Sequence, residues 1–163
     1  MKNITDWFQE AERVAQGALC TRAKCGAVIV AGDNIIGEGY NAPPRDDAHN
    51  GKCANEEYDR AKKPKYDLTC CVHAEWRAIM DALRNHPEQL VGATLYYVRL
   101  GEDGKARPSG APFCTVCSRL ALDVAIAKFG LLHTDGPMLY DSRDYNEQSY
   151  AFHLSSSHDR LAS

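Results

Sequence analysis

The sequence contains no uninterrupted apolar segment close to the roughly 20 residues that a membrane-spanning helix needs. Its first residues, 1–7, also lack the apolar core of a secretory signal peptide. Basic residues are not in excess, because 19 lysines and arginines stand against 22 aspartates and glutamates and leave a net charge of −3. Binding to nucleic acid would need a clustered basic surface. We therefore expect a cytoplasmic protein that contacts neither membranes nor nucleic acid.

Cysteine, in contrast, is plentiful, since the chain holds seven. An odd number of cysteines without an export signal favours metal binding in a reducing compartment over a disulfide framework. The chain has 163 residues, of which 44% are hydrophobic and 25% are charged, as is typical of a globular protein. We expect a single domain over residues 1–163, with a frayed tail at 155–163.

Hydrophobic periodicity predicts alternating helices and strands after an opening hairpin. Apolar residues spaced by three and four indicate a helix over 4–19, with Thr5 or Asp6 near its cap. The other expected elements are strands at 25–31 and 34–40 joined at Gly32-Asp33, a helix at 72–85, a strand at 92–100, a loop at 101–111, a helix at 114–125, and strands at 127–132 and 137–140. This order predicts an α/β fold in three layers, helix–sheet–helix, around a central mixed sheet of about five strands.

Two short segments carry the residues typical of a zinc site. Cys71-Val-His-Ala-Glu75 offers His73 as a nitrogen ligand, and Pro112-Phe-Cys-Thr-Val-Cys117 offers Cys114 and Cys117 at CxxC spacing. One histidine and two cysteines leave the fourth position of a tetrahedral zinc open, which is typical of catalytic rather than structural zinc. Both segments begin predicted helices, so the positive ends of two helix dipoles would point towards one centre.

Glu75 is the candidate catalytic residue. Zinc lowers the pKa of a bound water to about 7, and hydrolysis of an amino-substituted ring also needs a group that carries the water's proton to the departing ammonia. Glu75 lies two positions after His73 and is not required as a ligand, so it is suited to that role. Taken singly, each of these residues could be an ordinary helix residue, and only their combination indicates a site.

The combination resembles the zinc-dependent nucleobase deaminases, which carry H-x-E followed by P-C-x-x-C and use the glutamate as acid and base rather than as a ligand. His73-Ala-Glu75 fits this pattern unchanged, whereas Phe113 stands between the proline and the first cysteine, where the family usually has no residue. Two further segments are similar to deoxycytidylate deaminases: Cys20–Val30 resembles their first strand, and Gly39–Pro44 resembles their Gly-Tyr-Asn-Gly-x-Pro loop. The resemblance covers most of the chain, about residues 5–142, and implies a cytidine-deaminase-like fold.

The resemblance also implies contacts with a nucleotide. Asn41 would hold the sugar, Arg22 would lie near the phosphate, and the backbone N–H of Ala74 would contact the pyrimidine. An ordinary turn asparagine and an exposed strand-edge arginine are the alternatives for the first two. A basic run in the long polar loop at 41–70 could attract a phosphate or simply be solvated, and its members are Arg60, Lys62, Lys63 and Lys65. Arg77 replaces the asparagine usual in these enzymes and could alter substrate choice.

Some deoxycytidylate deaminases carry a second, structural zinc, and the resemblance extends to residues near its ligands. The candidates here are Cys20, His49 and Cys53, with Cys70 or Cys71 as the fourth. A metal at this place would order the long loop, which has little core of its own. The alternative is that Cys20, Cys25 and Cys71 are small buried hydrophobic residues, as free cysteines often are.

The leading prediction is a zinc-dependent hydrolase that deaminates a pyrimidine deoxynucleotide, with dCMP converted to dUMP and ammonia. A second prediction keeps this chemistry but acts on a free base, a nucleoside or a purine such as guanine. A third is a zinc-stabilised regulatory module without catalysis, against which the intact Glu75 speaks. The expected partners are a small-molecule nucleotide as substrate and further copies of the chain in a homo-oligomer.

Overall fold

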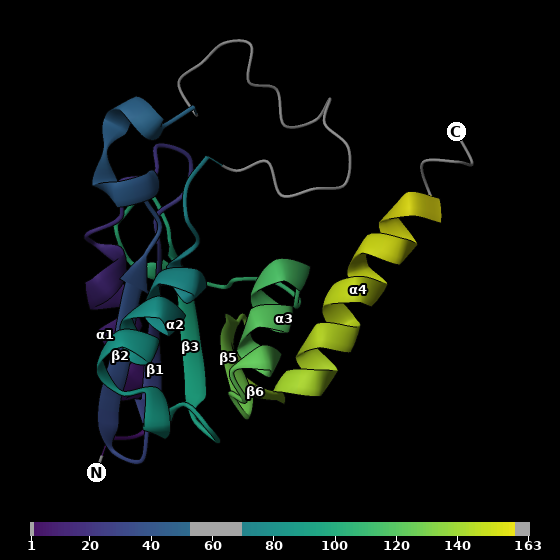
Figure 1. Cartoon of the computed structure of the whole chain (residues 1–163). Coiled ribbons are helices and arrows are strands. Elements are labelled where there is room, and N and C mark those ends of the chain that lie inside the picture. Colours follow the sequence, from purple (N-terminus) through teal and green to yellow (C-terminus); the bar gives the residue numbers. More distant parts are fainter. Residues whose placement is uncertain (1, 53–69, 159–163) are drawn as a thin grey trace.

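The computed structural model describes residues 2–52 and 70–158, with side chains as far as residue 155 (Figure 1). The helices of this part are α1 (Ile4–Ala15), α2 (Ala74–Asn85), α3 (Thr115–Asp123) and α4 (Ser142–His158). The strands are β1 (Cys25–Ala31), β2 (Asn34–Tyr40), β3 (Thr94–Leu100), β4 (Ala106–Arg107), β5 (Lys128–His133) and β6 (Gly136–Asp141). The predicted hairpin and the predicted alternation of helices and strands are both present.

The strands form one mixed sheet. Its order is β2-β1-β3-β5-β6, and the short β4 pairs with β3 off this path. β1 runs antiparallel to β2 and β3, β5 runs antiparallel to β6, and β3 and β5 are parallel. This arrangement confirms the predicted mixed sheet, while β4 lies within the segment at 101–111 that the sequence indicated as a loop.

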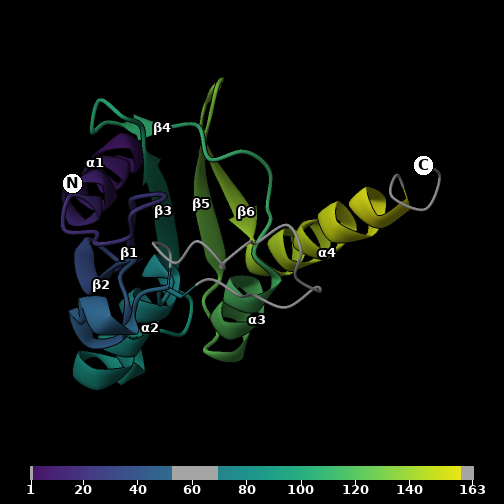
Figure 2. The ribbon, with the colours of Figure 1, turned by 90° about the horizontal axis from the view of Figure 1, so that it is seen from above.

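Helices cover both faces of the sheet (Figure 2). Successive residues of a strand project to opposite faces, so β1 contributes to both layers. On one face, Trp7 and Phe8 of α1 pack with Val28 and other strand residues. On the other face, residues of α2, α3 and α4 are buried with strand residues, among them Ile79, Ala121, Tyr145, Ile29, Leu95 and Phe129. The predicted three-layer α/β fold is therefore confirmed.

Two glycines allow α2 to lie directly on β2. A Cβ atom at Gly39 would come within 2.2 Å of the carbonyl oxygen of Ala74, and one at Gly37 within 2.3 Å of that of Ala78. Such contacts are too short for any side chain, so the approach depends on glycine. Because Ala74 is the first residue of α2, Gly39 sets the position of the helix end that follows His73.

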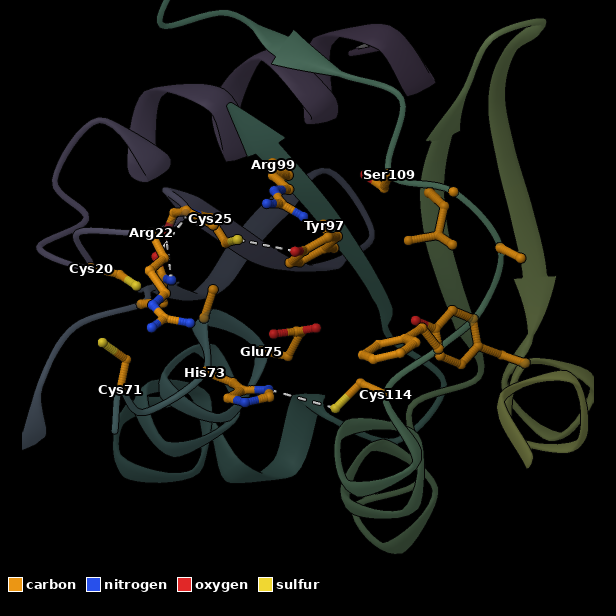
Figure 3. Close-up of a pocket in the computed structure, with 18 of the residues that line it drawn as sticks. Cys20, Arg22, Cys25, Cys71, His73, Glu75, Tyr97, Arg99, Ser109 and Cys114 are labelled. Atoms are coloured by element: carbon orange, nitrogen blue, oxygen red, sulfur yellow. Dashed lines mark hydrogen bonds between the residues drawn. The ribbon is translucent and has the colours of Figure 1, made fainter. Parts of the chain in front are cut away.

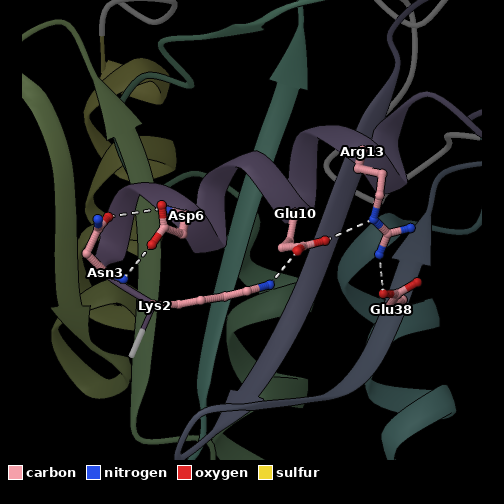
Figure 4. Close-up of polar contacts among 6 residues, drawn as sticks. All are labelled: Lys2, Asn3, Asp6, Glu10, Arg13 and Glu38. Carbon is pink, nitrogen blue, oxygen red and sulfur yellow. Dashed lines mark hydrogen bonds and ion pairs between the residues drawn. The ribbon is translucent and has the colours of Figure 1, made fainter.

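Asn3 caps α1, and the predicted Thr5 and Asp6 lie next to this cap in the first turn of the helix. Its Oδ1 accepts a hydrogen bond from the backbone N–H of Thr5 at 2.8 Å and one from that of Asp6 at 3.1 Å (Figure 4). Asp6 Oδ2 in turn accepts from the backbone N–H of Asn3 at 2.7 Å, which completes a capping box. The helix is also tied to β2, since Arg13 forms an ion pair with Glu38.

Helix α4 has no counterpart among the predicted elements. Its most deeply buried positions include serines as well as an aromatic ring, since Tyr145 is 3% exposed and Ser149 is fully buried. No apolar stripe therefore marks the helix in the sequence. The tail expected to fray from residue 155 is helical as far as His158, and residues 159–163 lie outside the described part. None of the helices described is both long and apolar enough to cross a membrane.

Candidate active site

The starts of two helices bring the two predicted zinc-binding segments together. His73 is the residue immediately before α2, and Cys114 is the residue immediately before α3. The backbone N–H of Cys117 donates to Cys114 Sγ over 3.2 Å, so the first turn of α3 sets the spacing of the two sulfur atoms. Helix N-termini favour negative charge, and the start of α3 therefore suits the thiolates of Cys114 and Cys117.

The three candidate ligands are arranged as a zinc ion requires. His73 Nδ1 lies 3.1 Å from Cys117 Sγ and 3.5 Å from Cys114 Sγ. All three ligand atoms lie within 4.8 Å of one another. Zinc bonds of about 2.0–2.1 Å to nitrogen and about 2.3 Å to sulfur, in a tetrahedral arrangement, imply a separation of about 3.6 Å between the two ligand atoms. The residues present thus fit a catalytic zinc with one position left for another ligand.

The surroundings of these side chains shift the pKa values of both cysteines and orient the histidine ring. The hydrogen bond with the Cys117 thiol is the largest cause that lowers the pKa of Cys114, to about 5, and the hydrogen bond with His73 adds to it. Burial instead raises the pKa of Cys117, which is fully buried. The His73 ring is stacked on the indole of Trp76, with 4.8 Å between the ring centroids. Trp76 therefore restricts the orientation of the histidine.

Glu75 projects into the same site from the first turn of α2 (Figure 3). It is 5% exposed. Burial is the largest cause that raises the pKa of Glu75, to about 7, and the negative charge of Cys114 contributes further. A carboxyl group whose pKa is near neutrality can both accept and return a proton.

His73, Glu75 and Cys114 line a cavity of about 420 Å³. Its wall includes Cys20, Arg22, Ala23, Cys25, Asn41, Cys71, His73, Ala74, Glu75, Tyr97, Arg99, Ser109, Gly110, Ala111, Phe113, Cys114, Leu131, Tyr145 and Phe152. Tyr97 of β3 donates a hydrogen bond to Cys25 Sγ of β1 over 3.0 Å, which links the side chains of the two strands in the cavity wall (Figure 3). The volume is in the range of small-molecule sites.

The predicted substrate-binding residues Arg22, Asn41 and Ala74 all line this cavity. Asn41 is 9% exposed, and its amide bridges two backbone groups: Oδ1 accepts from Cys25 N–H and Nδ2 donates to Ala23 C=O, both over 2.8 Å. Asn41 therefore also fixes the start of β1. Arg22 is exposed at the cavity wall.

The candidates for a second zinc are only partly described. Cys20 and Cys71 line the cavity, and Cys70 Sγ lies 4.0 Å from Cys71 Sγ. The side chain of His49 is 96% exposed, and its Nδ1 pairs with Asp47 over 3.0 Å. Within residues 2–52 and 70–158, the group of side chains placed to bind a metal ion is His73, Cys114 and Cys117. Cys53 and the basic run Arg60, Lys62, Lys63 and Lys65 lie outside the described residues.

Several residues of the site were not predicted. Arg99 follows Tyr97 by two positions on β3, so both project from the same face, but a lone arginine at the end of a strand gives no motif. Phe152 comes from the unpredicted helix α4. Arg77 does not line the cavity: it donates to Asp46 over 2.7 Å and to the carbonyl of Pro43 over 2.9 Å. Arg77 thus holds the loop after Asn41 in place.

The sequence matches a family described as the cytidine and deoxycytidylate deaminase zinc-binding region over residues 1–132. It is 26% identical over 128 residues to a deoxycytidylate deaminase of Schizosaccharomyces pombe, which covers 77% of this chain and 34% of that protein. It is also 35% identical over 94 residues to a deoxycytidylate deaminase of Mycobacterium phage D29, covering 55% of this chain and 71% of the phage protein. The chain thus spans about a third of the S. pombe relative's length.

A solved structure has a similar fold. The cytidine deaminase from Burkholderia pseudomallei superposes with a TM-score of 0.58 and is 15% identical in sequence. The superposition covers 88% of this chain and 96% of the other. At this identity the likeness concerns the fold, and it agrees with the three layers and the mixed sheet described above.

Proposed function

This chain belongs to the cytidine and deoxycytidylate deaminase family, and we propose that it hydrolyses dCMP to dUMP and ammonia with zinc held by His73, Cys114 and Cys117. The two relatives compared above are both named deoxycytidylate deaminases. Their names support a pyrimidine deoxynucleotide over the alternative substrates.

One observation carries the proposal. Glu75, a buried carboxyl group, lines the same cavity as His73 and Cys114, two of the three zinc-binding side chains, and the third, Cys117, is grouped with them. A structural zinc is normally closed by a fourth protein ligand, and it would not need a buried carboxyl group beside it. The cost of burying Glu75 is explained if that group takes part in the reaction.

In the proposed reaction, the zinc ion and Glu75 would have different roles. Bound zinc supplies Lewis acidity and lowers the pKa of a water molecule to about 7. Glu75 would accept the two protons of the attacking water in turn and pass one to the neighbouring ring nitrogen and one to the amino nitrogen, which leaves as ammonia while the water's oxygen stays on the ring carbon as a carbonyl. The near-complete burial of Glu75 keeps bulk water away from the proton in transit.

The start of α2 would also bind the base. Ala74 is the first residue of the helix, where a backbone N–H has no partner within the helix, and it lines the cavity. This N–H would donate to an acceptor on the pyrimidine ring. Asn41 would contact the sugar from the neighbouring wall, with the amide hydrogen that its bond to Ala23 leaves over.

A substrate panel tests the proposal. Ammonia release is measured for dCMP, deoxycytidine, cytosine and guanine with zinc-loaded protein, and dCMP should give the highest kcat/KM. A preference for a purine, or for the free base, would assign the chain to another branch of the family. No ammonia from any of the four would instead support the regulatory module without catalysis.

A further inference from the structure

Two polar side chains on the cavity wall have buried atoms without a hydrogen-bond partner. They are Nε of Arg99 and Oγ of Ser109. Buried polar atoms are almost always paired, and an exception often marks a place for an ion or ligand. Trp76 and Ser142 hold similar atoms but do not line the cavity. Arg99 and Ser109 therefore single out one part of the wall.

Arg99 also lies in a positively charged part of the sheet. The register of β3 and β4 places Arg99 directly opposite Arg107, and residues so paired project from the same face of the sheet. Like charges in this arrangement are destabilising. In the part of the chain that the structure describes, neither arginine forms an ion pair with an acidic side chain. An anion between the two guanidinium groups would offset the repulsion.

Ser109 belongs to the segment between β4 and α3. Its backbone N–H donates to the carbonyl of Leu132 over 2.8 Å, so this part of the segment is anchored to β5. Figure 3 shows Arg99 and Ser109 across the cavity from His73 and Cys114, with Glu75 in the space between. A ligand with its ring at Glu75 could therefore extend an acceptor group towards Arg99.

We propose that Arg99 and Ser109, with Arg107 opposite Arg99 on the neighbouring strand, bind the phosphate group of the substrate. This inference rests on the proposed function as a nucleotide deaminase. A guanidinium group offers a planar fork of donors that matches phosphate oxygens, and the hydroxyl group adds one more donor. The phosphate site then lies on β3 and the segment after it, rather than at Arg22 or the lysines of the long loop that the sequence indicated.

The test compares kcat/KM for dCMP and for deoxycytidine. Arg99→Gln should lower the value for dCMP at least about tenfold, through loss of charge-assisted hydrogen bonds, and leave that for deoxycytidine within about twofold. Ser109→Ala should lower the dCMP value by about two- to tenfold. Arg84→Gln removes one exposed positive charge at the far end of α2, outside the cavity, and should change neither value. Equal losses on both substrates, or no loss on dCMP, would overturn the proposal.

Binding of inorganic phosphate gives a second readout that needs no turnover. Its Kd, measured by calorimetry on the wild type, should rise at least about tenfold in Arg99→Gln, and phosphate should compete with dCMP. Equal phosphate binding by the two proteins, or binding that does not compete with dCMP, would contradict the assignment. If the wild type deaminates no substrate, the proposed function fails, whereas the calorimetry with phosphate and dUMP still decides the phosphate site.

Folding of each variant is checked by its melting temperature. If Arg99→Gln does not fold, Arg99→Lys and Ser109→Ala replace it, because the lysine keeps the charge and loses only the planar fork. Arg99→Lys should then show a smaller loss on dCMP with deoxycytidine unchanged. Unaltered preference for dCMP over deoxycytidine in both variants would overturn the proposal.

Discussion

Glu75 and His73 are two residues apart at the start of α2, yet they have different roles: in the proposed reaction, His73 is a zinc ligand and Glu75 carries protons. Glu75 is a carboxyl group that the metal does not need as a ligand, so Glu75→Gln should keep zinc content and melting temperature near those of the wild type. Its turnover should fall at least about 10²-fold, because the amide cannot carry the proton. Ammonia release, zinc content and thermal melting check the three expectations.

Glu88 has an exposed carboxylate outside the cavity, so Glu88→Gln is the control for Glu75→Gln. It should match the wild type in all three measurements. Near wild-type turnover of Glu75→Gln would show that the proton takes another route. Loss of zinc from that variant would show that Glu75 belongs to the metal site.

The two cysteines are each needed for the metal. Cys114→Ser and Cys117→Ser should lose zinc, because a hydroxyl group is a much poorer zinc ligand than a thiolate. Both variants should also melt at lower temperature, since the ion and the fold stabilise each other. Elemental analysis and thermal melting measure the effects, with Thr115→Ser, on the same turn of α3, as the control. Full zinc content in the Cys114→Ser/Cys117→Ser double variant would exclude this site.

Asn41 combines a structural role with the proposed contact to the sugar. Because its amide holds two backbone groups at the start of β1, Asn41→Ala should lower the free energy of unfolding by about 1–3 kcal/mol. It should also lower kcat/KM for dCMP and deoxycytidine by a similar factor, since the two substrates share the sugar. Chemical denaturation and steady-state kinetics check both parts. A selective loss on dCMP would instead place Asn41 at the phosphate.

At the residue scale, the motifs predicted that His73, Cys114 and Cys117 come together, but they did not indicate residues that reach the cavity through strand pairing. His73, Cys114 and Cys117 could be found because metal ligands need particular residue types at particular spacings. Arg99 has no such spacing, and only the pairing of β3 with β1 and β4 brings it to the cavity. Arg77, which the sequence indicates as a candidate for altering substrate choice, forms an ion pair with Asp46 of the loop after Asn41 and does not line the cavity.

At the scale of elements, periodicity located the strands of the hairpin and both helices that carry the ligands. It failed for α4, where buried serines replace apolar residues, and for β4, which is too short to show alternation. The unpredicted helix matters for the site. Phe152 of α4 lines the cavity and packs edge-on against Phe113, with 5.3 Å between the ring centroids, and His153 Nε2 lies 2.9 Å from the carbonyl oxygen of Phe113.

The contribution of α4 can be measured by substitution of Phe152. Phe152→Ala removes an aromatic contact worth about 0.5–1.5 kcal/mol, so KM for dCMP should rise by about two- to tenfold while zinc content stays the same. Tyr150→Ala, an exposed aromatic on the same helix that does not line the cavity, is the matched control. Equal kinetics for the two variants would show that α4 covers the core without shaping the site.

At the scale of the whole molecule, the site joins segments that are far apart in the chain, residues 73–75 and 114–117. α2 lies on β1 and β2, whereas α3 packs against α4. The fold class could be predicted because the order of elements restricts the ways in which helices can cover a mixed sheet. The shape of the cavity could not be predicted from the sequence. It depends on how side chains from five different strands and helices, β1, β3, β5, α2 and α4, come together. The homo-oligomer and the cytoplasmic location stay predictions.

Zinc removal should therefore weaken the molecule as a whole. A ligand that binds only the folded state at 100 times its Kd adds about 2.7 kcal/mol of stability. For a chain of this length, each kcal/mol moves the melting temperature by about 2–4 °C. A chelator should thus lower the melting temperature of the wild type by at least about 5 °C, and added zinc should restore it. The Cys114→Ser/Cys117→Ser double variant controls for direct effects of the chelator and should not respond. An unchanged melting temperature in wild type that elemental analysis shows to be free of zinc would mean that the ion serves only the reaction and does not hold α2 and α3 together.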